Sequence, residues 1–279
     1  MSNTRPNPGP ITLCGSLSLH PVKTGAAMHE AAYRALELPF AYVPFGMTPE
    51  RLQDALVGMR ALGIRGFGVS MPFKQQVIEL LDELEPTARK IGAVNTIVND
   101  DGLLTGHNTD WSGALRALEE VVGPGGLRGR RTLLVGAGGA ARAVAFGLMQ
   151  AGAALTIANR TRSKAEKLAA DVGAKGVIDL GALHREVDFD VLVHATSVGM
   201  VGSDTATVIP VTALHPEMTV MDIVHDPHET QLIEDALRIG ATAVHGLRAL
   251  LHQAAAQFEL YTGLPAPRDA MEAALAEVG

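Results

Sequence analysis

The sequence predicts an α/β protein of two domains. Short apolar runs alternate with longer amphipathic segments from end to end, which is the pattern of βα units around a mainly parallel sheet. A glycine-rich turn at 136–141 follows one apolar run and precedes a helix-compatible segment. The chain is 47% hydrophobic but only 4% aromatic and contains 30 glycines, so we expect a core of Ala, Val, Leu and Ile with many tight turns.

The first βα series occupies the N-terminal part of the chain. Thr48 is expected to cap a helix whose first residue is Pro49. The Asp101-Gly102 dipeptide predicts a tight hairpin between two strands. The expected strands are Ile11–Ser16, Ala41–Phe45, Gly66–Met71, Ala93–Val98 and Leu103–Gly106, and the expected helices are Gly25–Leu36, Pro49–Leu62 and a segment from about Lys74.

A second βα series begins at Thr132. The glycine-rich segment Gly123–Gly126 before it is the best linker candidate in the chain. Ser163 and Glu166 have the spacing of a capping box at the start of a helix. The further expected strands are Leu155–Ala158, Val191–Ala195, Val220–Val224 and Ala241–Val244, and the closing helices are Leu247–Tyr261 and Arg268–Val278.

Composition and charge exclude several classes of function. The net charge of −7 argues against broad binding of nucleic acid or of anionic membranes. The apolar stretch Ala143–Ala158 is interrupted by Gln150 and Gly152, so we expect no membrane span. The segment Met1–Pro10 lacks the pattern of a secretory signal.

A single cysteine, Cys14, rules out an intrachain disulfide and fits a reducing cytoplasm. It lies in an apolar run, where a buried and inert thiol is expected rather than a nucleophile. We therefore expect a cytoplasmic protein.

The turn at 136–141 has the pattern Gly-x-Gly-x-x-Ala of a dinucleotide-binding Rossmann unit, directly after the strand Arg131–Val135. Gly136 permits the tight turn, Gly138 lets the backbone approach a pyrophosphate, and Ala141 allows close packing of helix on strand. The phosphates then lie on the amides at the helix N-terminus. A merely structural glycine turn is the alternative. The expected contacts are Gly136, Gly138, Gly139, Ala140 and Ala141.

The end of the next strand indicates which dinucleotide is bound. NAD enzymes place a carboxylate there for the ribose 2′-hydroxyl, but this chain has Asn159-Arg160-Thr161 and then Lys164. Cations suit a 2′-phosphate, and Arg160 can also stack on adenine. The alternative is a solvated basic helix start, although cations there oppose the helix dipole. NADP is favoured over NAD, with contacts to Asn159, Arg160, Thr161 and Lys164.

Two polar segments in the first series suggest catalysis. Lys74 follows the end of a buried strand, where ligands of α/β sheets bind, and Asp110 lies at the expected domain junction. A Lys–Asp pair can take the hydroxyl proton during alcohol oxidation. In isolation, Lys74 would more often be a surface lysine and Asp110 a helix N-cap.

Together the motifs resemble those of the shikimate dehydrogenase family over nearly the whole chain. They occur in the same order as in that family, which is more specific than any one motif alone. They are Val69–Lys74, Ala93–Thr96, Asn108–Asp110, Gly136–Ala141, Asn159–Thr161, Ala195–Met200 and Gln253–Gly263.

The resemblance implies roles for individual residues. Lys74 and Asp110 match the catalytic pair, and Ser70, Asn95 and Gln253 match substrate-binding positions. It also implies that the last helices return to the first domain, giving a substrate domain of residues 1–108 and 247–279 and a doubly wound NADP domain of residues 109–246. Further cofactor contacts implied by the resemblance are Thr196, Ser197, Met200 and Gly246.

The carboxylate-binding loop departs from the family pattern. The family has a Ser-x-Ser-Pro segment shortly before a histidine, whereas the equivalent places before His29 are Lys23 and Gly25. Ser16 and Ser18 lie further upstream. Either these serines still reach the substrate carboxylate, or Lys23 and Thr24 replace them. We expect Ser16 and Ser18 to bind it, with Lys23 adding attraction.

Three histidines replace other family residues: His194 an Asn, His225 a Tyr and His245 an Asp. This pattern resembles the divergent shikimate dehydrogenase-like branch more than the biosynthetic enzyme. The cluster from His225 to His228 has poor spacing for metal ligands, so we expect no metal site. His194, His225 and His245 are expected to line the cleft between the domains or to bond strand-end carbonyls.

The leading hypothesis is an oxidoreductase that transfers a hydride between NADP(H) and a ring carbon of shikimate or a related cyclic hydroxy-acid such as quinate. A different two-domain dehydrogenase, for instance one acting on folate carbon units, is disfavoured by Lys74, Asn95, Asp110 and Gln253. A non-catalytic sensor of shikimate or NADPH is the alternative from another class. The expected partner is a small molecule, and a homodimer is one option that the sequence leaves open.

Overall fold

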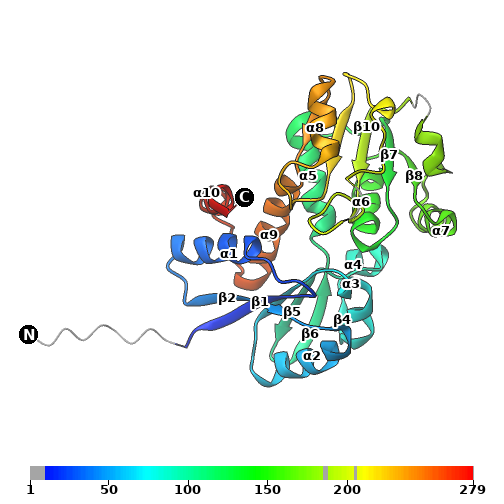
Figure 1. The fold of residues 1–279 in the computed structure, drawn as a ribbon. Helices are drawn as coiled ribbons and strands as arrows, with labels where there is room; N and C mark the ends of the chain where they lie inside the picture. Colours follow the sequence, from blue (N-terminus) through cyan, green and yellow to red (C-terminus); the bar gives the residue numbers. More distant parts are fainter. Residues whose placement is uncertain (1–9, 185–187, 204–205, 279) are drawn as a thin grey trace, which may run out of the picture. The chain divides into compact units, whose positions relative to one another are not determined.

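The computed structural model describes residues 10–184, 188–203 and 206–278 (Figure 1). The segment 1–9, where the sequence analysis expects no secretory signal, lies outside these residues. The chain forms two compact units. The first comprises Met1–Lys90, Val94–His107 and Ala254–Gly279, and the second comprises Ile91–Ala93 and Asn108–Gln253. The division into substrate and cofactor domains at the sequence-based boundaries stays a prediction.

The sheet of the first unit mixes parallel and antiparallel strands. β1, β2 and β3 are parallel, whereas β5 is antiparallel to β3 and to β6. The predicted hairpin between β5 and β6 is confirmed, with Asp101 and Gly102 at φ of 51° and 95°. The strand order is β2 (Phe40–Gly46), β1 (Thr12–Ser18), β3 (Gly66–Val69), β5 (Thr96–Asp100), β6 (Leu103–His107) and β4 (Glu83–Leu84).

Successive side chains of β1 point to opposite faces of the sheet. Leu17 belongs to the buried cluster that α2 (Leu52–Ala61) covers with Leu56 and Met59. Ser16 and Ser18 therefore lie on the opposite face. The other helical segments of this unit are α1 (Thr24–Ala35), η1 (Pro49–Arg51), α3 (Phe73–Gln76), η2 (Val77–Leu80), α4 (Pro86–Ile91), the end of α9 (Gly246–Thr262) and α10 (Arg268–Val278).

The second unit is a doubly wound parallel sheet, as the sequence predicts. Its strands follow the order third, second, first, fourth, fifth and sixth along the chain, so the winding direction reverses between β7 and β10. Ligands of such sheets bind outside the strand carboxyl ends at this switch point. The order is β9 (Gly176–Ile178), β8 (Ala154–Ala158), β7 (Arg131–Val135), β10 (Val191–His194), β11 (Thr219–Asp222) and β12 (Thr242–Val244).

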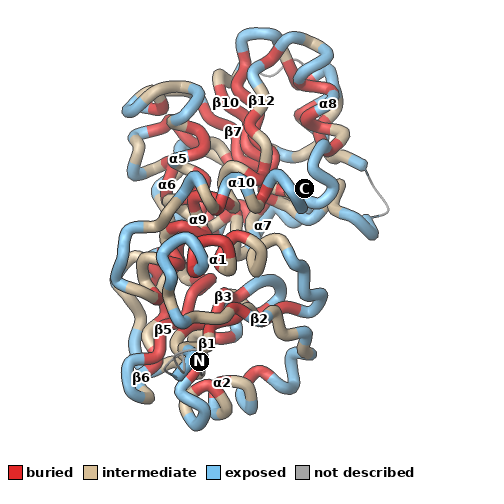
Figure 2. The backbone as a smooth tube through the Cα atoms, turned by 90° about the vertical axis from the view of Figure 1, so that its left-hand side faces the viewer, coloured by how far each residue is buried: buried red, intermediate tan, exposed pale blue. Residues whose placement is uncertain are grey.

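Both faces of this sheet are covered, so its strands are apolar on both sides (Figure 2). Leu134 and Val193 pack toward one buried cluster, and Leu133 and Leu192 pack toward the other. The first cluster contains residues of α5 (Asp110–Val122), α6 (Gly139–Gln150) and α7 (Arg162–Val172), and the second contains residues of η3 (Leu180–His184), η4 (Val211–Ala213) and α8 (Gln231–Arg238). Gly147 allows α6 to approach α5, since a Cβ there would lie 2.9 Å from the Trp111 carbonyl oxygen.

Two sequence-based expectations about this unit are wrong. α7 begins at Arg162 with Thr161 as its N-cap residue, so Ser163 lies in the first turn and forms no capping box. Gly123–Gly126 lies inside the second unit, where Gly123 ends α5 with a positive φ of 80°. The chain passes between the units near residues 91–93, 107–108 and 253–254 instead.

Cys14 has no exposed surface, and burial raises the pKa of its thiol to about 11. The thiol therefore remains protonated near neutral pH, as expected of an inert core residue. No helix among the described residues combines the length and apolar character needed to cross a membrane.

Candidate functional site

The predicted phosphate-binding turn lies at the switch point of the second unit. Gly136 follows β7 with φ of 132°, and a Cβ there would lie 2.5 Å from the Ala195 carbonyl oxygen, so only glycine fits. Gly138 precedes α6 in an extended conformation, and a Cβ on it would meet no atom within 4 Å. The space over this helix N-terminus is therefore open, while Ala141 is fully buried beneath it. These residues fit a dinucleotide pyrophosphate.

The residues after β8 fit a phosphate on the adenosine ribose. The Asn159 side-chain amide donates to the Thr161 carbonyl oxygen at 2.9 Å, which fixes this short loop. Arg162 forms ion pairs with Glu166 and Asp179, with nitrogen–oxygen distances of 2.8 and 2.9 Å. Arg160 is exposed and makes no ion pair with any residue that the structure describes. Arg160 and the exposed Lys164 of α7 are therefore the cations that could bind a 2′-phosphate here.

The loops after β10 and β11 adjoin the phosphate turn. A Cβ on Gly136 would lie 3.3 Å from the Thr196 methyl carbon, so the 195–200 loop lies directly beside it. Gly246, at the start of α9, lies against the end of β11, because a Cβ there would be 2.3 Å from the Val224 carbonyl oxygen. The structure thus brings three predicted cofactor positions, Gly136, Thr196 and Gly246, to one edge of the second sheet.

In the first unit, three backbone hydrogen bonds gather the predicted substrate residues. The Val69 amide donates to the Asn95 carbonyl oxygen at 2.7 Å, and the Val94 amide donates to the Lys74 carbonyl oxygen at 2.8 Å. The Ser70 amide donates to the Leu17 carbonyl oxygen at 2.9 Å. The ends of β1 and β3 and the residues before β5 are therefore joined. Ser18, Ser70, Lys74 and Asn95 lie at this common edge.

Asn95 is held by residues that the sequence analysis missed. The Gln257 side-chain amide donates to the Asn95 carbonyl oxygen at 3.1 Å and to the Thr96 hydroxyl at 3.0 Å. The Thr96 hydroxyl in turn donates to Asn95 Oδ1 at 2.9 Å, which fixes the orientation of the Asn95 amide. Gln257 follows the predicted Gln253 by one helical turn, and this spacing was the available signal.

The predicted carboxylate-binding serines lie at the end of β1, where one is buried and the other is hydrogen-bonded. Ser18 is buried, and its hydroxyl has no hydrogen-bond partner among the residues that the structure describes. Ser16 is half-buried and hydrogen-bonds the Tyr42 phenol, whose pKa is raised by burial. Lys23 is exposed at the start of α1, and Thr24 is the first residue of that helix. An unsatisfied buried hydroxyl is rare and fits a group that awaits a ligand.

His29 anchors this loop. Its ring is fully buried and stacks on the Tyr42 ring with centroids 4.3 Å apart. Burial lowers the pKa of His29 to about 4. His29 is therefore neutral at pH 7 and supplies no charge for a substrate carboxylate.

Asp110 is the first residue of α5, and its N-cap is Thr109, so the N-cap interpretation of Asp110 is wrong. The Asp110 amide donates to Asn108 Oδ1 at 3.0 Å, and the Asn108 side-chain amide donates to the Ala93 carbonyl oxygen at 2.9 Å. Asp110 and Gln253 belong to the second unit and Lys74 to the first. The catalytic pairing of Lys74 with Asp110 stays a prediction.

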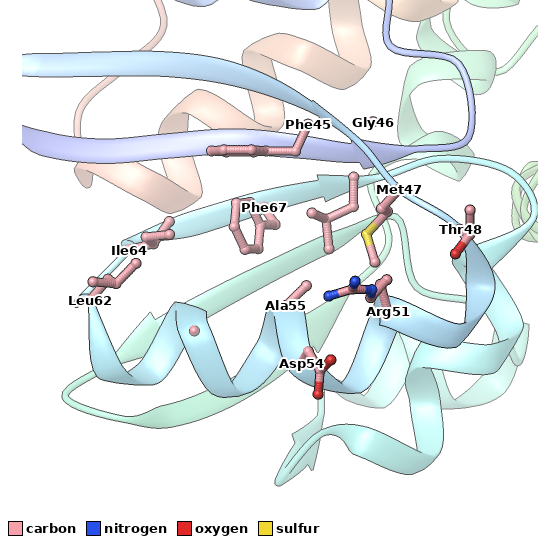
Figure 3. A pocket seen from close by; sticks show the side chains of 12 residues that line it. Phe45, Gly46, Met47, Thr48, Arg51, Asp54, Ala55, Leu62, Ile64 and Phe67 are labelled. Carbon is pink, nitrogen blue, oxygen red and sulfur yellow. The ribbon is translucent and has the colours of Figure 1, made fainter.

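A groove of about 770 Å³ in the first unit lies between α2 and the sheet (Figure 3). It is lined mainly by apolar side chains, including Phe45 and Phe67, with Arg51 and Asp54 on the helix side. It is not the predicted substrate site, because Leu17 lines it while Ser16 and Ser18 lie on the other face of β1.

The structure also shows where the unusual histidines lie. His194 is buried and bonds Asp222 and Thr196, so the expectation that it lines a cleft or bonds a strand-end carbonyl is wrong. His228 stacks on His245 with ring centroids 5.3 Å apart. Within the described part of the chain, no three His, Cys, Asp or Glu side chains are grouped as a metal site would require.

Comparison with known proteins assigns both units to one family. The substrate binding domain of shikimate dehydrogenase matches residues 20–97, the shikimate / quinate 5-dehydrogenase family matches residues 118–225, and the shikimate 5′-dehydrogenase C-terminal domain matches residues 246–276. The shikimate dehydrogenase (NADP(+)) of Methanothermobacter thermautotrophicus is 42% identical over 259 residues, covering 90% of each chain.

Solved structures agree over almost the full length. A shikimate dehydrogenase crystallised with NADP+ superposes with a TM-score of 0.88 at 36% identity and 96% coverage of both chains. Quinate dehydrogenase from Corynebacterium glutamicum, crystallised with NAD, gives 0.85 at 33% identity, covering 96% of this chain and 99% of that one. The 5-ketofructose reductase of a Gluconobacter strain superposes with a TM-score of 0.83 at 34% identity, covering 97% of this chain and 100% of that one. The chain therefore belongs to the shikimate dehydrogenase family.

Proposed function

We propose that this protein is an NADP-dependent oxidoreductase that interconverts shikimate and 3-dehydroshikimate, or a closely related cyclic hydroxy-acid such as quinate and its ketone. The observation that carries the proposal is the likeness to NADP-dependent shikimate dehydrogenases across both units. The open helix N-terminus at Gly138 and the unengaged Arg160 support NADP as the cofactor. The single buried cysteine suits a reducing cytoplasm.

The chemistry requires a proton acceptor beside the reacting carbon. As hydride leaves that carbon, its hydroxyl loses a proton and the carbon–oxygen bond becomes a carbonyl; bound NADP+ supplies the hydride acceptor. In the proposed mechanism, Lys74 and Asp110 take this proton and return it in the reverse direction. Asn95 and Gln253 bind the ring hydroxyls. Ser16 and Ser18 bind the carboxylate, with Lys23 adding charge.

A second candidate substrate is a ketose without a carboxylate. The specific observation is the departure of the loop before His29, which lacks the paired serines of the family at their usual distance. The related 5-ketofructose reductase provides the precedent for such a substrate on this fold. A non-catalytic sensor is less consistent with a chain that retains both Lys74 and Asp110.

A turnover screen tests the proposal. NADP and NAD are each assayed with shikimate, quinate and their amino analogues, and NADPH and NADH are assayed with 5-ketofructose. We expect shikimate with NADP to give the highest kcat/KM, at a lower turnover than that of biosynthetic shikimate dehydrogenases, because the carboxylate loop is remodelled. Turnover of 5-ketofructose alone would shift the assignment to the second candidate. Absence of turnover with tight NADPH binding would favour the sensor.

The oligomeric state, with a homodimer as one candidate, is read from light scattering of the same samples.

Replacement of Lys74 tests the proton-transfer step. Lys74→Ala should lower kcat by about 10²-fold or more, because a general acid–base is lost. NADP affinity should be unchanged, because the proposed role of Lys74 is in proton transfer and not in binding of the cofactor. Lys90→Ala, which removes an exposed lysine of α4, is the matched control. If Lys74→Ala kept the wild-type kcat, Lys74 would be only a surface lysine without a part in proton transfer.

Arg160 should determine the preference between the two nicotinamide cofactors. Arg160→Ala removes a charge-assisted contact to the 2′-phosphate and should raise the KM for NADP roughly ten- to a hundredfold, with little change for NAD. Arg162→Ala removes the same charge from a residue already paired with Glu166 and Asp179, so it serves as the control. Equal changes for both cofactors in Arg160→Ala would contradict this role.

The carboxylate loop is tested by comparing three single variants. Ser16→Ala and Ser18→Ala should each lower kcat/KM for shikimate by about tenfold, more than Lys23→Ala does, because strand-end hydroxyls orient a carboxylate better than one exposed charge. Melting temperatures distinguish the two serines. Ser16→Ala should lower the melting temperature, because it removes the hydrogen bond with Tyr42, whereas Ser18 has no such bond to lose. Ser163→Ala, an exposed serine of α7, is the control. An effect of Lys23→Ala alone would show that the serines do not touch the substrate.

A further inference from the structure

The unusual histidine at the end of β10 belongs to a buried chain of hydrogen bonds. His194 and Asp222 end the adjacent strands β10 and β11, where they are in register, and each is 1% exposed. His194 Nδ1 lies 2.9 Å from Asp222 Oδ1, and His194 Nε2 lies 2.5 Å from the Thr196 hydroxyl. Asp222 Oδ2 also accepts from the Thr230 hydroxyl at 2.7 Å. The chain therefore links the loop after β10 to the start of α8, which Thr230 caps.

Backbone donors fix part of this hydrogen-bond chain. Asp222 Oδ1 accepts from the Val224 amide at 3.0 Å. The Thr196 hydroxyl accepts from the Val198 amide at 3.1 Å and is hydrogen-bonded to His194 Nε2. Two partners from different segments therefore hold the Thr196 hydroxyl in one orientation.

Thr196 is also in contact with the phosphate turn. Its methyl carbon would lie 3.3 Å from a Cβ at Gly136, and the Ala195 carbonyl oxygen is closer still at 2.5 Å. The Ala195 amide donates to the Val135 carbonyl oxygen at 2.8 Å. Rotation of Thr196 would therefore disturb the turn on which the dinucleotide lies. His194 and the Val198 amide together prevent that rotation.

We propose that His194 is a positioning residue for the cofactor: Asp222 holds the His194 ring, and the ring holds the Thr196 hydroxyl in the orientation that hydrogen-bonds the nicotinamide–ribose half of NADP. This inference rests on the proposed function, because it requires that the second unit binds NADP. His194 itself touches no reacting atom. Its effect should appear in the binding of the cofactor and not in the binding of the hydroxy-acid.

The proposal differs from a purely structural role for the same hydrogen bonds. A structural role predicts lower thermal stability with unchanged Michaelis constants for the fraction that stays folded. A positioning role predicts a higher KM for NADP with an unchanged KM for shikimate. It also predicts that loss of either His194 or the Thr196 hydroxyl has the same effect, so that the two losses together add little.

The experiment is a double-mutant cycle with Thr196→Val, His194→Ala and both together. His194→Ala removes both ring nitrogens, whereas Asn is the family residue at this position and could keep the hydrogen bond. Thr196→Val keeps the methyl group beside Gly136 and removes only the hydroxyl, so it should fold even if His194→Ala does not. Thr196→Ser keeps the hydroxyl and serves as the conservative rescue. His215→Ala is the matched control, because His215 bonds the Phe189 carbonyl at 2.9 Å elsewhere in the same unit. The readouts are melting temperature, Kd for NADPH by fluorescence, and KM for each substrate.

We expect each single variant to raise the KM for NADP and the Kd for NADPH by about tenfold, the double variant to match them, and Thr196→Ser to restore most of the affinity. Unchanged cofactor constants in folded Thr196→Val, or equal losses for NADP and shikimate, would overturn the proposal while leaving the proposed function intact. Wild-type protein that binds no NADPH would overturn both, and that result is visible before any variant is made.

Discussion

The contact between Gly136 and the Ala195 carbonyl oxygen is the constraint on which the second unit depends. It joins the ends of β7 and β10, the two strands between which the sheet reverses its winding direction. A side chain at Gly136 would separate these strand ends, because its Cβ would lie 2.5 Å from that oxygen. The phosphate turn, the 195–200 loop and the start of α6 all take their positions from this approach. The proposed cofactor site at this edge is therefore a consequence of strand order and of one missing methyl group.

In the first unit, polar side chains are held at the edge of a buried sheet. Thr96 and Gln257 both hydrogen-bond Asn95, and His29 stacks on Tyr42. Buried polar groups that are hydrogen-bonded in this way are held in fixed orientations. The predicted substrate residue Asn95 is therefore rigidly held, while Lys23 at the start of α1 is exposed.

Local patterns sufficed for most of the fold and for the cofactor turn. The doubly wound sheet, the Asp101-Gly102 hairpin and the turn from Gly136 to Ala141 each follow from residues adjacent in sequence. Sequence reasoning failed where the deciding contact is distant. Gln257 reaches Asn95 across 162 positions, and Asp222 is 28 positions from His194, so neither pairing follows from residues adjacent in sequence. The start of α7 was also predicted wrongly, because Thr161 and Ser163 are both residue types that favour helix N-caps and the helix begins after Thr161.

The alternation of side chains along β1 has an evolutionary consequence. Leu17 belongs to the core beneath α2, while Ser16 and Ser18 lie on the opposite face, so the strand cannot gain or lose one residue without exchanging core and site. The loop between Ser18 and α1 carries no such restriction, because it ends at a helix anchored independently through His29. Insertions and deletions can therefore accumulate in that loop without loss of the fold. We expect substrate range to vary through this loop, whereas β1, the strand proposed to carry the carboxylate-binding serines, is fixed by the core on its other side.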